Sequence, residues 1–281
     1  MKRLDLLLFE KGLVKSREKA RALIMEGVVS VNGTPVTKAG AMCAEDAELL
    51  IREDTVPFVS RGGLKLEKAF RTFPITLEHA AAADIGASTG GFTDCMLQHG
   101  ASHVYAIDVG YGQLDWKLRT DERVTVMERT NARYMEPSWF EGPLDFASID
   151  VSFISLSKIL PGLLPCLKEG GQVAALIKPQ FEAGRKEVGK NGVVRNETVH
   201  ASIIRKVLDF SLETGFHARG LSYSPITGPK GNIEFLLYLV RPAGTESPEC
   251  SVTEEDCAET VREAHRTLAE RAAGKKDDPA E

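Results

Sequence analysis

The sequence of 281 residues contains no run of eighteen or more apolar residues, so it predicts no transmembrane helix. Its first residues, Met1 to Asp5, lack the apolar core and the small-residue cleavage site of a signal peptide. The five cysteines are scattered and odd in number, so no disulfide framework is expected. We therefore expect a folded protein of the cytoplasm.

Several site signatures are also missing. No pair of cysteines has metal-ligand spacing, and the interval from His99 to His103 spans a predicted helix end and a strand start. We therefore predict no metal site. The chain also lacks the Gly-x-x-x-x-Gly-Lys phosphate loop and the Gly-x-Gly-x-x-Gly turn of dinucleotide folds. ATP and NAD are accordingly disfavoured as ligands.

The net charge of −5 is unevenly distributed along the chain. Residues 244–281 carry eleven acidic and five basic side chains, whereas residues 1–40 carry eight basic and four acidic ones. A basic head is compatible with a nucleic-acid partner. The acidic tail is predicted to be partly helical or disordered.

The first sixty residues predict a compact α+β module. A helix over 4–12 and a second over 17–26, capped by Ser16, precede a strand over 28–31. Asn32-Gly33 is the strongest short hairpin signal. We place this domain at 1–54 and a linker at 55–60.

Residues 61–243 predict strands that alternate with helices. Strands are expected over 80–85, 104–108, 124–127, 146–149 and 172–177, with a closing pair over 216–223 and 233–240. Helices are expected over 63–72, 93–99, 154–167 and 198–214. This alternation predicts a doubly wound α/β fold with a mostly parallel sheet.

A glycine-rich turn follows the first strand of this sheet, with Gly86 and Gly90 four residues apart. No Lys or Arg lies in the turn to meet a phosphate, and Asp84 could face a positive group such as a sulfonium. Asp108 ends the next strand, where a carboxylate accepts hydrogen bonds from a ribose diol. The pattern favours S-adenosylmethionine, although the glycines could only serve strand–helix packing. The candidate cofactor residues are Asp84, Gly86, Ser88, Thr89, Gly90, Gly91, Phe92 and Asp108.

Four ionisable residues lie beside apolar segments: Lys65, Asp150, Lys178 and Glu234. Each alone could be a solvated edge charge. Asp150 and Lys178 are stronger candidates as a pair, because both end strands on the ligand side of the sheet. A lysine can act as a general base if burial and a second ammonium lower its pKa.

The four residues resemble the Lys-Asp-Lys-Glu tetrad of FtsJ-type ribose 2'-O-methyltransferases. The head resembles the RNA-binding domain first seen in ribosomal small-subunit protein four, through Arg3-Leu4-Asp5, Ser16-Arg17 and Val29 to Gly33. The order of the two domains, with Lys178-Pro179-Gln180-Phe181-Glu182, is similar to the TlyA family over roughly residues 1–240.

That resemblance implies a Rossmann-like S-adenosylmethionine-dependent methyltransferase sheet behind a small N-terminal α+β RNA-binding domain. It implies 2'-O-methylation of cytidine in ribosomal RNA, with Lys178 as the base. It also carries an older hemolysin label, so a membrane-active hemolysin and an RNA-binding protein with an inert methyltransferase fold remain alternatives. The residues implied to meet RNA are Arg3, Lys15, Ser16, Arg17, Lys19 and Arg21.

Overall fold

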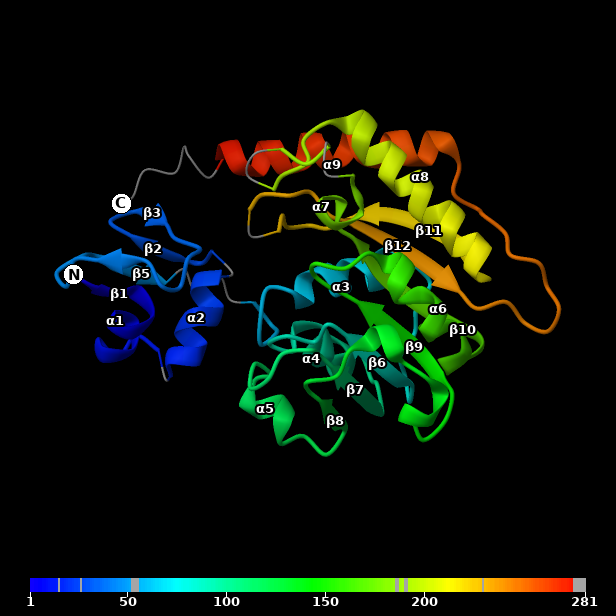
Figure 1. Cartoon of the computed structure of the whole chain (residues 1–281), viewed down its shortest axis with the longest axis horizontal. Helices are drawn as coiled ribbons and strands as arrows, with labels where there is room; N and C mark the ends of the chain where they lie inside the picture. Colours follow the sequence, from blue (N-terminus) through cyan, green and yellow to red (C-terminus); the bar gives the residue numbers. More distant parts are fainter. Residues whose placement is uncertain are drawn as a thin grey trace. The chain divides into compact units, whose positions relative to one another are not determined.

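The computed structural model describes the chain except residues 15, 26, 52–55, 185–186, 190–191, 229 and 275–281. It divides into two compact units, Met1–Pro57 and Phe58–Glu281 (Figure 1). The start of the predicted linker, Thr55, lies outside the described residues.

The first unit is the small α+β module that the sequence predicts. Its helices α1 (Leu4–Glu10) and α2 (Arg17–Met25) pack together around a small apolar core that includes Leu8 and Ile24. Asn32 and Gly33 have φ of 49° and 75°, as expected for an Asn-Gly hairpin turn. The strands are β1 (Lys2–Arg3), β2 (Val29–Val31), β3 (Thr34–Pro35), β4 (Met42–Cys43) and β5 (Leu49–Ile51).

The second unit is built on a seven-stranded sheet in the order β11-β12-β10-β9-β6-β7-β8. Strands β6 to β10 pair in parallel, and β12 pairs antiparallel with both β10 and β11. The chain order reverses between β6 and β9, which is the topological switch point of the sheet. The strands are β6 (Ala81–Ile85), β7 (His103–Ile107), β8 (Val124–Met127), β9 (Leu144–Ile149), β10 (Leu167–Ile177), β11 (His217–Tyr223) and β12 (Phe235–Val240).

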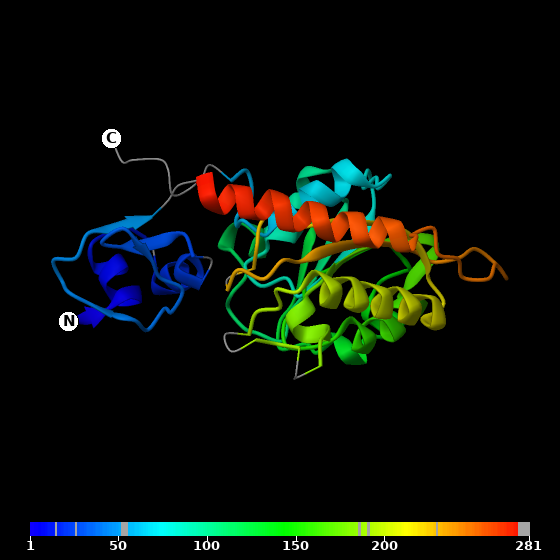
Figure 2. The same cartoon turned by 90° about the horizontal axis from the view of Figure 1, so that it is seen from above.

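Helices cover both faces of this sheet, so the predicted doubly wound α/β class is confirmed (Figures 1 and 2). On one face, α6 (Leu160–Leu163) and α8 (Glu197–Thr214) join the main core. On the other, α3 (Gly63–Thr72) packs with α4 (Gly91–Gln98), and Phe70 contacts Phe146 of β9 at 5.8 Å between ring centroids. The short helices α5 (Trp116–Arg119) and α7 (Pro179–Glu182) complete the fold.

The acidic C-terminal segment forms α9 (Glu254–Gly274), which packs on α8 and β11. Cys257, Val261 and Ala264 are buried in the main core. The helical part of the predicted tail is therefore an integral layer of the second unit. Residues 275–281, expected to be disordered, lie outside the described residues.

The helix expected over 154–167, which Pro161 was expected to kink or divide, is divided into the 3-10 turn Leu156–Lys158, α6 and the 3-10 turn Leu164–Cys166, because Pro161 and Pro165 each remove a backbone donor. Strand starts also differ from the prediction. Strand β10 begins at Leu167 rather than at residue 172. The last strand begins at Phe235, so Glu234 lies just before it.

Candidate functional site

The glycine turn after β6 meets the end of β9 at the switch point of the sheet. Ile85 and Ile149 are paired residues of these strands. Gly86 has φ of +90°, and a Cβ there would lie 2.6 Å from the backbone oxygen of Asp150. Only glycine allows this approach without strain. The turn therefore brings the expected cofactor loop directly beside one member of the predicted tetrad.

Asp108 follows β7 and braces the same turn. Its carboxylate accepts hydrogen bonds from the backbone N–H groups of Ser88, at 2.8 Å, and Gly110, at 2.6 Å. Asp108 and Thr89 are partly exposed, and Ser88 is exposed. A carboxylate oxygen can accept more than one hydrogen bond, so Asp108 stays available to a ribose diol. These residues fit a nucleoside cofactor.

Other predicted cofactor residues are buried. Asp84 is fully buried, and its carboxylate accepts hydrogen bonds from Thr93 at 2.6 Å and Ser148 at 3.2 Å. Burial raises its pKa to about 7. Its side chain therefore holds the start of α4 in place. Because it is buried, it cannot contact the positive group of a cofactor, contrary to the expectation from the sequence. Gly90, Gly91 and Phe92 are buried too, so they support the turn from the protein interior.

The four residues of the predicted tetrad converge. Asp150, after β9, lies between the two lysines: one oxygen is 3.3 Å from Lys65 Nζ, and the other forms an ion pair with Lys178. Lys65, on α3, also lies 2.7 Å from Glu234 Oε2. Segments 169 positions apart in the sequence, from residue 65 to residue 234, thus form one connected group.

This group is largely removed from solvent. Lys65, Lys178 and Glu234 are buried, at 8%, 8% and 1% exposure. Burial would raise the pKa of Asp150, but the two ammonium groups outweigh it and lower that pKa to about 2. Burial would lower the pKa of Lys65, yet the charges of Asp150 and Glu234 raise it above its usual value. Lys65 is therefore a fixed cation.

Sequence reasoning missed two residues that follow Asp150. The Ser152 hydroxyl accepts a hydrogen bond from Lys178 Nζ at 3.2 Å. Phe153 has φ of 66°, is 91% exposed and lies 5.1 Å from the ring of Phe181. A positive φ in an exposed aromatic residue three positions after Asp150 makes Phe153 a candidate functional residue, but it leaves no periodic signal in the sequence.

In the first unit, all three arginines that were predicted to bind RNA surround Asp5. The Asp5 side chain is fully buried. Arg3 Nε and Arg21 Nε each lie 3.0 Å from its carboxylate, and an Nη atom of Arg17 lies 3.3 Å away. Hydrogen bonds from Arg3 and the other guanidinium groups hold the pKa of Asp5 far below its usual value, against the effect of burial. One anion thus orients three partly exposed cations.

The other predicted RNA contacts differ in their surroundings. The Ser16 hydroxyl accepts a hydrogen bond from the backbone N–H of Lys19 at 3.1 Å, so Ser16 caps α2 as expected. Lys15 lies outside the described residues.

The sheet and its loop at the switch point define a Rossmann-like methyltransferase. Residues 58–241 match the FtsJ-like methyltransferase family and residues 2–49 match the S4 domain. The chain therefore belongs to the FtsJ-like methyltransferase family, and its cofactor is S-adenosylmethionine, as the sequence predicts.

Full-length relatives agree with this assignment. YqxC of Bacillus subtilis (strain 168) is 53% identical over 96% of each chain. The 16S/23S rRNA (cytidine-2'-O)-methyltransferase TlyA of Mycobacterium tuberculosis (strain ATCC 25618 / H37Rv) is 42% identical over 84% of this chain and 89% of its own. A solved structure described as a putative hemolysin from Streptococcus thermophilus is 48% identical, covers 97% of this chain and 98% of its own, and gives a TM-score of 0.78. Within the described part of the chain, no helix is both long and apolar enough to cross a membrane.

Proposed function

We propose that this protein transfers a methyl group from S-adenosylmethionine to the 2'-hydroxyl of a cytidine ribose in ribosomal RNA. The observation that carries the proposal is the connected group of Lys65, Asp150, Lys178 and Glu234 beside the glycine turn. The name of the mycobacterial relative supports the choice of nucleoside and of RNA. We expect the protein to act in the cytoplasm, where ribosomes are.

The cofactor supplies an electrophilic methyl group when bound. Gly86 lets the turn pack against the backbone of Asp150, which would hold the cofactor loop beside the tetrad, and Asp108 would accept hydrogen bonds from the cofactor ribose. Ser88 and Thr89 contribute the exposed edge of the turn.

Lys178 removes the proton of the substrate hydroxyl. To act as the base it must first lose its own proton. Asp150 and the Ser152 hydroxyl fix the direction of its Nζ atom. Lys65, held by Glu234, donates a hydrogen bond to the ribose and offsets the negative charge that develops on the attacking oxygen.

The first unit binds the RNA that carries the target. Guanidinium groups pair with phosphates in a planar fork. The arrangement around Asp5 orients Arg3, Arg17 and Arg21 before RNA arrives, which reduces the entropy lost on binding.

The test is the variant Lys178→Ala. We expect it to lose transfer of labelled methyl groups to ribosomal subunits while its affinity for S-adenosylmethionine, measured by calorimetry, changes less than about threefold, since Lys178 does not hold the cofactor. The matched control is Lys168→Ala, on the strand β10 that Lys178 follows, where the side chain is half exposed and paired with Asp145. Full activity in Lys178→Ala would refute the assigned base. Loss of cofactor binding in the unaltered protein would favour an inert fold.

A further inference from the structure

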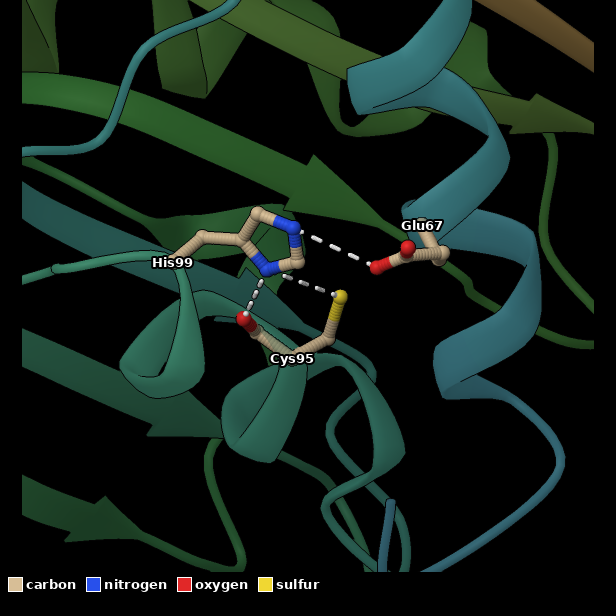
Figure 3. A group of neighbouring side chains, drawn as sticks. All are labelled: Glu67, Cys95 and His99. Atoms are coloured by element: carbon tan, nitrogen blue, oxygen red, sulfur yellow. Dashed lines mark hydrogen bonds and ion pairs between the residues drawn. The ribbon is translucent and has the colours of Figure 1, made fainter. Parts of the chain in front are cut away.

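A second group of side chains with ligand chemistry lies outside the tetrad, between α3 and α4. Glu67 comes from α3, Cys95 from α4, and His99 ends α4 (Figure 3). A carboxylate oxygen, the thiol sulfur and a ring nitrogen of these residues lie within 4.8 Å of one another. Neither the tetrad nor the cofactor turn uses any of the three.

The hydrogen bonds of His99 decide what can sit between it and Glu67. Its Nδ1 lies 2.9 Å from the backbone oxygen of Cys95, and a carbonyl oxygen only accepts, so Nδ1 carries the hydrogen. Its Nε2 faces Glu67 Oε2 at 3.2 Å. With its hydrogen on Nδ1, His99 presents the lone pair of Nε2 toward Glu67 Oε2, so a metal cation placed between these two atoms would be bound by both.

The spacing of His99 Nε2 and Glu67 Oε2 suits a tetrahedral metal ion, and the Cys95 sulfur, 3.8 Å from Nδ1, would have to move toward that ion to bind it. Bonds of about 2.0 Å from such an ion to nitrogen and oxygen place those two atoms roughly 3.3 Å apart, close to the 3.2 Å between Nε2 and Oε2. Cys95 adds a soft sulfur ligand, and sulfur with imidazole selects zinc-like cations over magnesium or calcium.

Outer contacts hold two of the three side chains in place. The guanidinium of Arg71 binds the other oxygen of Glu67, at 2.6 Å and 3.0 Å. The ring of His99 packs on Phe70 with centroids 4.7 Å apart. Metal sites are supported by such contacts, which orient the ligands and fix the histidine tautomer.

We propose that Glu67, Cys95 and His99 bind a thiophilic divalent cation of the zinc class that ties α3 to α4. The sequence predicted no metal site because it lacks pairs of cysteines or histidines with metal-ligand spacing. This trio has a single cysteine, a single histidine and a glutamate, so a search for such pairs does not find it. α3 carries Lys65 and α4 begins at the cofactor turn, so the cation would brace two helices that frame the active site. The inference stands independently of the methylation chemistry.

The probe is Co²⁺, added to the chelator-treated full chain with the exposed Cys250 changed to serine. A cobalt–thiolate bond absorbs in the near ultraviolet. We expect this band to saturate at one equivalent and to disappear when Zn²⁺ is added. It should be absent in Cys95→Ser and present in the control Cys166→Ser, which alters a buried cysteine elsewhere.

Two further variants keep the proposal testable if Cys95→Ser fails to fold. Glu67→Gln and His99→Ala should each weaken Co²⁺ binding roughly tenfold or more. A missing band in the parent protein, or unchanged binding in these variants, would overturn the proposal.

Discussion

Replacing Asp150 by asparagine should destabilise the second unit in a pH-dependent way. Asp150 is the carboxylate that contacts both Lys65 and Lys178. Without its charge, two buried ammonium groups lie close together with only Glu234 to offset them. Breaking a buried ion pair by removing one partner costs about 3–5 kcal/mol. We expect that loss in the free energy of unfolding at pH 7.

The sign of the pH effect follows from the lysines. In Asp150→Asn one ammonium can escape repulsion by losing its proton, so its folded-state pKa falls and raising the pH restores part of the stability. Urea unfolding at pH 7 and pH 9.5 measures this recovery.

The control is Asp121→Asn, which breaks a more exposed pair with Arg123 and should cost about 1 kcal/mol or less at either pH. A loss below about 1 kcal/mol for Asp150→Asn, equal at both pH values, would refute the account of the tetrad's electrostatics.

Three further perturbations test other parts of the account. Asp84→Asn should stabilise the protein at pH 8 by up to roughly 4 kcal/mol and little at pH 4. The pKa of Asp84 is about 7 in the folded state and 3.8 in its ordinary, unfolded surroundings, so the stability of the wild-type protein falls as the pH rises from 4 to 7. Equal urea-unfolding curves for the two proteins at pH 8 would contradict this. Gly86→Ala places a Cβ 2.6 Å from the Asp150 backbone oxygen at φ of +90°, so it should cost about 2–3 kcal/mol and weaken cofactor binding in calorimetry. Arg21→Gln should lower RNA affinity and reduce the slope of its salt dependence by about one, and an unchanged slope would remove Arg21 from the phosphate contacts.

Much of the site could be predicted because several of its residues directly follow apolar strands. Asp150 and Lys178 follow β9 and β10, and parallel strands deliver their carboxyl ends to one edge. Gly86 was predicted from the same position after β6. Lys65 and Glu234 lie on a helix and before a strand, so only the family resemblance connected them to the pair.

Other features depend on tertiary contacts that no local pattern reports. Asp84 lies one residue before the end of β6, in register with Ser148, and Thr93 and Ser148 enclose its carboxylate. The charge of the C-terminal segment masked the apolar face that packs α9 on the core. The strand pair β1 and β4 has two residues in each strand, too few for periodicity to appear.

The most direct test of the central claim is to map ribose methylation after purified protein acts on unmethylated ribosomal subunits. The account predicts S-adenosylmethionine-dependent 2'-O-methylation of cytidine, lost in Lys178→Ala and kept in Lys168→Ala. Methylation of a base edge or of a protein, or ribose methylation that survives Lys178→Ala, would contradict it.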